Sequence, residues 1–317
     1  MLLKFDTDSF NQWEAGQKIA TNEILSAVAS YQKNIPFTHP SVLIENFRFL
    51  LTHLQKDKRL LAEMLTLPTL KFIGEQMPVV AVDALCAARE FMIEAIATAL
   101  EHEFLTLYHS LHTANAFDMA DVGPRALRQV CLAYLCNVKH ATHIALATKQ
   151  FTQLGINMTD TMGAFKCLVN VENAARDSAI ADFYAHFAND TLVLDKWFSL
   201  QATAKLPGTL DAVKALLKHE AFDIKNPNKV YALIAAFTHN NMKYFHAADG
   251  SGYDFLADVI SKLDPLNPQV AARMVRPLVE WHRFDAGRQI AMKKALNAIL
   301  GLKNLSKDVY EIVSKSL

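Results

Sequence analysis

Helical periodicity along nearly the whole chain is the feature that most constrains its fold. From Pro124 onward, apolar residues recur at every third or fourth position, at Leu127, Val130, Cys131, Tyr134, Leu135 and Val138. This spacing is typical of one face of an α-helix. The same pattern recurs at Met158, Met162, Phe165 and Val169, and again at Met292, Leu296, Ile299 and Leu300. We find no alternating strand pattern and no Asn-Gly hairpin signal, so the sequence predicts an all-α fold.

Capping residues indicate where these helices begin and end. Asn226 and Asn267 are each followed by proline, which is harmless at the first helical position because an N–H there has no partner within the helix. Gly301 is expected to end a helix near residue 300, and Ser306 to cap the last one. These boundaries divide the chain into about sixteen short helices with brief connections.

Short helices in series, with no strands, favour an α-solenoid of HEAT-like or armadillo-like helical hairpins. We find no clean sequence repeat of roughly 40 residues. Any repeat is therefore one of structure, and its sequence has diverged between copies. No Gly/Ser-rich or Pro-rich linker divides the chain, so we expect one domain over residues 1–317. A stack of this kind curves and offers a concave surface.

Composition excludes several classes of protein. Lys plus Arg and Asp plus Glu both number 32, and the zero formal net charge disfavours a broad nucleic-acid-binding surface. The four cysteines are too scattered for a disulfide framework and indicate reduced thiols in a cytoplasmic protein. No apolar run reaches the roughly 18 residues of a membrane span, so no membrane partner is expected. The abrupt start "MLLKFDTDSF" suggests a fragment of a longer protein.

The segment Asp249-Gly250-Ser251-Gly252 is the most glycine-rich in a chain with only ten glycines. A phosphate loop is disfavoured because the third glycine and the preceding strand are both absent. The segment instead suits a turn, with Asp249 or Ser251 capping a helix that starts near Tyr253. Free N–H groups at such a helix start would also suit an anionic or polar group.

Two histidine–glutamate pairs begin like the zinc motif His-Glu-x-x-His. They occur in "HEFLT" from His102 and in "HEAFD" from His219. Both lack the second histidine one helical turn later, so neither supplies two ligands on one helix face. Zinc binding at these pairs is not expected.

Two further histidine pairs have the spacing of neighbours on a helix face. These are His109 with His112, and His140 with His143. A zinc site needs at least a third ligand, and none stands at a fixed spacing from either pair. We therefore interpret these histidines as surface or partly buried residues, and no metal ligand is expected in this chain.

Arg273 and Arg276 lie three residues apart in "NPQVAARMVRPL". They suit the solvated edge of an amphipathic helix. Alternatively, one guanidinium faces a concave surface and meets a carboxylate. Spacing alone does not choose between these interpretations.

Several long strings of the sequence carry a resemblance to a known family. They are "LAEMLTLPT", "LVLDKWFSLQA", "NPNKVYALIAAF", "FHAADGSGYDFLADVI", "LNPQVAARMVRPL" and "LKNLSKDVYE". In this order they resemble the C-terminal helical domain of bacterial aminopeptidase N, a zinc alanyl aminopeptidase of the gluzincin class. The resemblance covers essentially the whole chain and is strongest from about residue 192 to the end.

The resemblance implies a bowl or cone of HEAT-like hairpins placed over the active site of a longer enzyme. The family's zinc motif, its completing glutamate, its Gly-x-Met-Glu-Asn motif and its transition-state tyrosine are absent from this chain. They belong to a catalytic domain, which would hold the zinc. We therefore expect this chain alone to bind no cofactor and to have no catalytic residue.

Site residues can be carried over from the family at two places. Arg273 matches a family arginine that faces the active-site cavity, where it would attract or position the distal part of a peptide. The family tends to carry a basic residue two positions after the one matching Lys229, and this chain has Tyr231 there. The turn at Gly250, Ser251 and Gly252 is expected near the same cavity.

The resulting hypothesis is a non-catalytic domain that encloses the active-site cavity of a zinc aminopeptidase and controls the access of peptides. Its partners would be the N-terminal and catalytic domains of the same polypeptide, together with peptide substrates. An alternative is a free-standing helical-repeat scaffold that binds a protein or peptide on its concave face.

Overall fold

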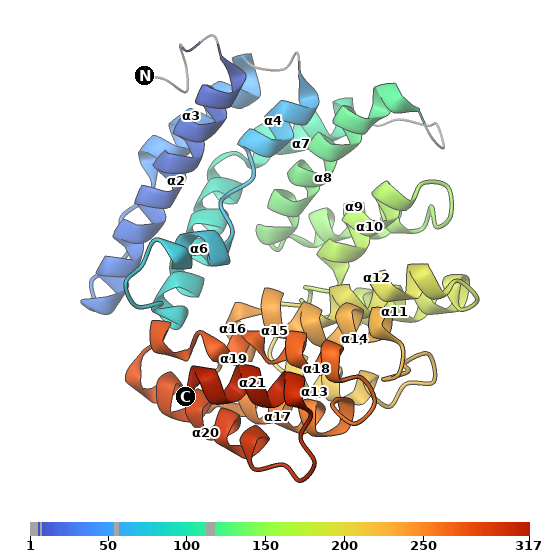
Figure 1. The fold of residues 1–317 in the computed structure, drawn as a ribbon. Coiled ribbons are helices and arrows are strands. Elements are labelled where there is room, and N and C mark those ends of the chain that lie inside the picture. The colour runs from blue at the N-terminus through green and yellow to red at the C-terminus, as the bar shows by residue number, and fades with distance from the viewer. Residues whose placement is uncertain (1–5, 7, 54–56, 112–117) are drawn as a thin grey trace. The chain divides into compact units, whose positions relative to one another are not determined.

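The computed structural model describes residues 6, 8–53, 57–111 and 118–317, and its regular structure is helical (Figure 1). The described residues contain no β-strand, and an isolated parallel bridge joins Val80 to Phe284. The all-α prediction is therefore confirmed. The first half of the chain forms α2 (Ser9–Gln32), α3 (Ser41–His53), α4 (Lys58–Met64), α5 (Leu70–Glu75), α6 (Val82–Ala99), α7 (Glu101–Ser110), η1 (Met119–Asp121), α8 (Val122–Asn137), α9 (Ala141–Phe151) and α10 (Met158–Leu168).

The second half of the chain consists of short helices, in keeping with the predicted series. Among all these elements, η1 and η3 are 3₁₀ turns, and η2 is a π-helical turn. The elements are α11 (Ala174–Phe187), α12 (Thr191–Ala202), α13 (Thr209–Leu216), α14 (Pro227–Val230), η2 (Tyr231–Ala235), α15 (Ala236–Asn240), α16 (Met242–Phe245), α17 (Ser251–Leu263), α18 (Pro268–Met274), α19 (Arg276–Val279), η3 (Trp281–Arg283), α20 (Ala286–Leu300) and α21 (Lys307–Ser316).

The described helices group into two compact units. Unit 1 falls within Met1–Ile73 and Ala84–Ala181, and unit 2 within Gly74–Asp83 and Asp182–Leu317. The expectation that residues 1–317 form a single domain stays a prediction, as does the curvature into a bowl or cone.

Helix α8 lies at the centre of unit 1, where it packs against α4, α7, α9 and α10. Most of its predicted apolar face is buried, at Leu127, Cys131, Tyr134 and Leu135. The ring of Tyr134 stacks on Phe104 with 4.6 Å between centroids, and its hydroxyl donates to the carbonyl of Leu65 at 2.8 Å. Burial also raises the pKa of Tyr134 above its ordinary value. In the core of unit 1, Tyr134 therefore packs its ring against another aromatic side chain while its buried hydroxyl keeps a hydrogen-bond partner.

A buried polar network, which the periodicity does not predict, also fastens α8 to its neighbours. Arg125 of α8 donates to the carboxylate of Asp160 on α10. Arg128, one turn later, donates from Nη2 to the hydroxyl of Tyr108 on α7 at 3.0 Å. That hydroxyl donates to Oε1 of Gln150 on α9, and Nε2 of Gln150 donates to the carbonyl of Asp160 at 2.8 Å. Four helices are therefore tied by groups that would be costly to leave unpaired.

The core of unit 2 is a cluster of aromatic rings around α17. Phe245 meets Tyr253 edge to face with 5.4 Å between centroids, and Phe237 meets Phe255 in the same way at 5.7 Å. Helix α20 packs along α17 and contributes Arg288, whose side chain is 6% exposed. Arg288 donates to Asp83, to Asp285 and to the carbonyl of His246, so its charge is buried with partners.

The caps predicted at Asn226, Asn267, Gly301 and Ser306 are confirmed. Asn226 accepts from the N–H of Asn228, and Asn267 accepts from that of Val270. Ser306 accepts from Val309, and its own hydroxyl donates to Asp264 at 2.5 Å. Gly301 follows the last residue of α20 and acts as its C-cap. These boundaries follow from residues next to the helix ends, so local sequence suffices to predict them.

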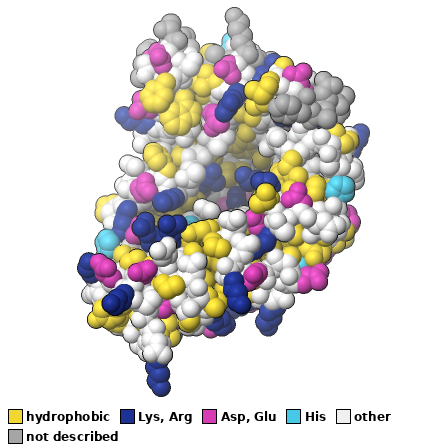
Figure 2. Space-filling model, turned by 45° about the vertical axis from the view of Figure 1, so that its right-hand side comes forward, with side chains coloured by type: hydrophobic (Ala, Val, Ile, Leu, Met, Phe, Trp, Pro, Cys, Tyr) yellow, Lys and Arg dark blue, Asp and Glu magenta, His cyan; other side chains and the backbone are white. Residues whose placement is uncertain are grey.

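The surface carries charges of both signs. Figure 2 shows Lys and Arg side chains interspersed with Asp and Glu over the face that it presents, in keeping with equal numbers of basic and acidic residues. Among the helices of the described residues, none combines the length and the hydropathy needed to cross a bilayer.

Candidate functional site

Two of the residues selected from the sequence, Arg273 and Tyr231, are in contact in unit 2. Arg273 lies in the last turn of α18 and is exposed. Its Nη1 donates a hydrogen bond to the hydroxyl of Tyr231 at 3.2 Å. The phenol therefore orients the guanidinium, whose other N–H groups have no partner among the described residues and can donate to an anionic ligand.

Tyr231 is positioned by the residue two places before it. Lys229 of α14 is buried, and its Nζ donates at 2.7 Å both to the carbonyl of Thr191 and to Oδ1 of Asp195. The ammonium group also lies 5.7 Å from the ring centroid of Phe198. These contacts fasten α14 to α12, because a buried ammonium is stable only with such partners.

The π-helical turn η2 begins at Tyr231 itself. A π-turn adds one residue to a helical turn and frees backbone groups from the regular ladder. Within this turn, the carbonyl of Ala232 accepts a hydrogen bond from the hydroxyl of Ser199 on α12 at 2.8 Å. The turn is therefore supported by the helix that also holds Lys229.

Arg276, the other arginine of the predicted pair, is the first residue of α19 and is also exposed. The hydrogen bond to Tyr231 belongs to Arg273. The exposure of both arginines agrees with the solvated edge of an amphipathic helix. The other interpretation, a guanidinium that faces a concave surface and meets a carboxylate, stays a prediction.

The turn at Gly250, Ser251 and Gly252 is held by close packing. Gly250 has a left-handed backbone with φ 74°, which glycine adopts without strain. A Cβ at Gly252 would lie 2.1 Å from the carbonyl oxygen of Phe245, so no side chain fits there. The atoms nearest to a Cβ at either glycine belong to Ala291, Tyr253 and Phe245 rather than to Arg273 or Tyr231. The cavity-lining role of the three residues stays a prediction.

The helix after this turn begins earlier than the sequence predicts. Helix α17 starts at Ser251 and not near Tyr253, with Gly250 as its backbone cap. Oδ1 of Asp249 accepts the N–H of Ser251 at 2.9 Å, and this hydrogen bond lowers the pKa of Asp249. The start shifts because the left-handed glycine, rather than a capping side chain, turns the chain into the helix.

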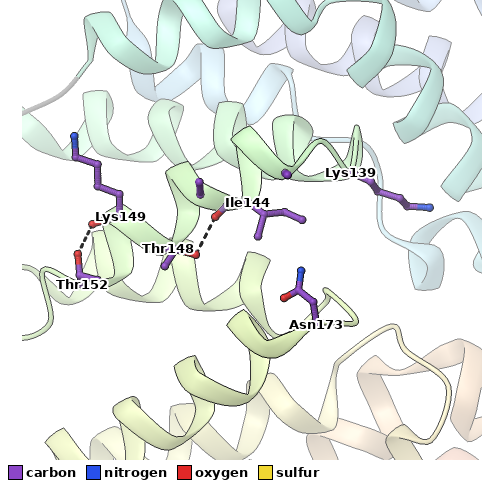
Figure 3. A pocket seen from close by; sticks show the side chains of 8 residues that line it. Lys139, Ile144, Thr148, Lys149, Thr152 and Asn173 are labelled. Atoms are coloured by element: carbon purple, nitrogen blue, oxygen red, sulfur yellow. Dashed lines mark hydrogen bonds between the residues drawn. The ribbon is translucent and has the colours of Figure 1, made fainter.

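A groove of unit 1, with a volume of about 630 Å³, runs along α9 (Figure 3). Thr148 and Thr152 turn their hydroxyls back onto the carbonyls of Ile144 and Lys149, at 3.0 and 2.8 Å. The two hydroxyl protons are therefore used within the helix, and the hydroxyl oxygens can act toward a ligand only as acceptors. The residues that line the groove are Lys139, Ala141, Ile144, Ala145, Thr148, Lys149, Thr152 and Asn173.

Comparison with known proteins identifies the family. The model of the family described as "Domain of unknown function (DUF3458_C) ARM repeats" matches residues 1–317. The chain belongs to this ARM-repeat family. Membership agrees with the predicted series of helical hairpins.

Curated relatives of this ARM-repeat chain are aminopeptidases N. The chain is 36% identical over 318 residues to aminopeptidase N of Haemophilus influenzae, covering 100% of this chain and 36% of that protein. The same identity and coverage hold over 319 residues for aminopeptidase N of Escherichia coli strain K12. The chain thus matches the C-terminal region of these proteins and spans about 36% of their length. The predicted resemblance is confirmed.

A solved structure resembles this ARM-repeat chain over nearly its full length. It is aminopeptidase A of Legionella pneumophila, determined in complex with aspartic acid. The match has a TM-score of 0.89 and 30% identity, and it covers 99% of this chain and 37% of that one.

The two incomplete zinc motifs of this ARM-repeat chain do not fit a catalytic zinc. Glu103 is paired with Arg48 at 2.9 Å, and Glu220 accepts from the hydroxyl of Tyr184 at 2.8 Å. The ring of His219 packs against Trp197, with 5.1 Å between centroids. His112, of the third pair, lies outside the described residues. No step of peptide hydrolysis is assigned to these side chains.

Proposed function

We propose that the chain is a non-catalytic domain of a zinc-dependent aminopeptidase, where it encloses the active-site cavity and controls which peptides enter. The observation that carries this proposal is the 36% identity to aminopeptidase N over the whole chain. Since the match spans 36% of those proteins, the zinc and its ligands would lie in the remainder of the parent enzyme. Folded proteins would be excluded by size, and peptides admitted.

Arg273 is the residue through which this domain would contact a peptide. An exposed guanidinium held by the Tyr231 hydroxyl offers several N–H donors in a fixed plane, which matches the geometry of a carboxylate. A peptide bound by its N-terminus at a catalytic centre would present its distal carboxylate to such a group. Binding at this distance from the scissile bond would act on peptide affinity and length preference more than on chemistry.

The first experiment separates the domain from the parent enzyme. The 317-residue chain is assayed with alanyl, leucyl and arginyl naphthylamides in the presence of ZnCl₂, beside the full-length aminopeptidase. The parent is expected to hydrolyse them and the isolated chain to show no turnover. Zinc-dependent hydrolysis by the isolated chain would refute the proposed division of labour. A free-standing scaffold is indicated if the natural coding sequence begins at Met1 without an upstream zinc motif.

The second experiment tests the contact with peptide. In the parent enzyme, Arg273→Ala is compared with Arg276→Ala, which removes the same charge from an exposed position three residues later. With Arg273→Ala we expect KM to rise several-fold for tri- to hexapeptides and to change little for an aminoacyl naphthylamide. Arg276→Ala is expected to leave both close to wild type. A uniform loss on all substrates, accompanied by a lower melting temperature, would contradict the role of Arg273.

A further inference from the structure

Three side chains of unit 1 direct one donor atom each toward a common point. Nδ1 of His140 lies 3.1 Å from Oε1 of Glu101, and Nε2 of His143 lies 3.2 Å from the same oxygen. All three donor atoms lie within 4.8 Å of one another. The sequence offered only the two histidines, because Glu101 stands 39 residues before His140 in the chain.

The local backbone explains why the three meet. Glu101 is the first residue of α7, and His140 is the cap residue directly before α9. His143 lies in the first turn of α9, so its spacing of three places it on the same side as His140. The ring centroids of the two histidines are 5.4 Å apart with planes inclined by 29°. Two helix starts therefore present the three donors.

His143 is buried, so these three residues are not simply a cluster of surface side chains. Its side chain is 4% exposed, and its Nε2 lies 3.2 Å from Oε1 of Glu101. Without a cation, Oε1 would have to accept a hydrogen bond from both imidazoles at once. The buried ring would depend on that shared oxygen alone, because its Nδ1 has no hydrogen-bond partner within the part of the chain that the structure describes. A divalent cation would instead bond to all three donors at once.

The distances suit a tetrahedral ion. With zinc–ligand bonds of about 2.0–2.1 Å, neighbouring donor atoms of a tetrahedral site stand roughly 3.3 Å apart. The two nitrogen–oxygen separations of 3.1 and 3.2 Å are close to this value, and the two nitrogen atoms lie within 4.8 Å of each other. Two imidazoles and one carboxylate are ligands that favour Zn²⁺ over Mg²⁺ or Ca²⁺, which prefer oxygen alone.

We propose that Glu101, His140 and His143 form a binding site for a divalent transition-metal cation, Zn²⁺ by donor chemistry. The side chain of His140 is 58% exposed and that of Glu101 is 32% exposed, so water can enter and complete the coordination. The ion joins the start of α7 to the start of α9. The proposal departs from the sequence-based expectation that the chain holds no metal ligand.

The test uses the 317-residue chain alone, stripped of metal and titrated with ZnCl₂ by calorimetry. We expect saturable binding of one ion per chain, and no saturable heat with MgCl₂. His140→Ala and Glu101→Gln change side chains that are partly or largely exposed, so both variants are expected to fold, which far-ultraviolet circular dichroism checks. Each is expected to weaken the Kd for Zn²⁺ at least about tenfold.

The matched control is His102→Ala, which removes an exposed histidine next to Glu101 and should leave zinc binding unchanged. This control matters because the chain has 12 histidines, any of which could bind zinc weakly. Thermal melting gives a second readout, since ZnCl₂ should raise the Tm of wild type and of His102→Ala more than that of the two ligand variants. The proposal is overturned if wild type shows no saturable site, or if the ligand variants bind zinc as wild type does.

Discussion

The guanidinium of Arg273 and the hydroxyl of Tyr231, 42 residues apart in sequence, share a hydrogen bond of 3.2 Å. One partner comes from the end of α18 and the other from the first residue of a π-helical turn. The pair therefore converts a flexible exposed arginine into an oriented one. Its consequences can be measured in the proposed parent aminopeptidase.

Tyr231→Phe removes the hydroxyl that accepts from Arg273 and keeps the ring. Because a hydrogen bond of this kind contributes about 0.5–1.5 kcal/mol, we expect KM for tri- to hexapeptides to rise roughly two- to tenfold. Steady-state kinetics on a peptide series measures this, with an aminoacyl naphthylamide as the short substrate. Tyr310→Phe, at an exposed tyrosine of α21, serves as the control. An unchanged peptide KM in Tyr231→Phe would show that the orientation of Arg273 is irrelevant.

Lys229→Met should destabilise the fold, because it removes two hydrogen bonds from a side chain that is 6% exposed. The carboxylate of Asp195 is then left half-buried without its ion-pair partner. We expect a loss of about 2–4 kcal/mol in the free energy of unfolding, measured by urea denaturation. Lys262→Met is the matched control, since its ion pair with Asp258 is largely exposed and should contribute less than about 1 kcal/mol. Equal effects of the two changes would contradict the structural role of Lys229.

Three glycine-to-alanine substitutions can separate the cost of a left-handed backbone from the cost of a steric clash. Gly208→Ala meets no atom within 4 Å and should cost only the left-handed backbone term, about 1 kcal/mol. Gly250→Ala adds a 3.0 Å contact with Ala291 and should cost more. Gly252→Ala places a methyl group against the carbonyl of Phe245 and should destabilise by at least about 3 kcal/mol. A denaturation midpoint for Gly252→Ala that is no lower than those of the other two variants would count against the close packing of Gly252 on Phe245.

The stability of the chain should fall below neutral pH through His246. This ring is stacked on Phe284 with 4.3 Å between centroids, and its Nδ1 lies 2.9 Å from the hydroxyl of Tyr253. Burial, with a smaller contribution from the Arg288 charge, lowers the pKa of His246 from its ordinary value of 6.5 to about 3. In the unfolded chain the same ring binds a proton near pH 6.5.

The direction of the pH dependence follows from the difference between the pKa of His246 in the folded and in the unfolded chain. Above pH 6.5 the ring is neutral in both states, and its contribution to stability is constant. As the pH falls from 6.5 toward 3, the unfolded state binds more protons than the folded state, so stability declines by up to about 1.4 kcal/mol per pH unit. Urea denaturation at pH 7, 6 and 5 measures the slope. His246→Leu should flatten it over this range, and an unaltered slope would assign the pH dependence to other groups.

Sequence alone predicts the parts of this structure that depend on neighbouring residues. The helical class follows from the spacing of apolar side chains, and the caps at Asn226, Asn267 and Ser306 follow from their own chemistry. The π-turn at Tyr231 does not follow from the sequence, because it is supported by Ser199 on another helix. Local propensity holds no information on such a partner.

In the candidate site, too, the sequence identifies single residues but not the contacts that tertiary packing creates between them. Arg273 and Tyr231 were selected individually through the resemblance to aminopeptidase N, but their hydrogen bond depends on how α18 packs. Arg288 is buried with Asp83, 205 residues earlier, and no pattern in the sequence connects the two. Likewise, spacing suggested His140 with His143, whereas Glu101 is brought to them only by the packing of unit 1.

The turn from Tyr231 to Ala235 holds one residue more than an α-helical turn would. Deleting one residue there would convert it into an α-helical turn and leave the helical phase on either side nearly unchanged, because a π-helical turn and an α-helical turn each complete about one revolution. Phe237 would keep its contact with the ring of Phe255, and Lys229 its place beside α12. A one-residue gap at this segment in an alignment would therefore signal the loss of the bulge, and with it a changed position of the tyrosine that contacts Arg273.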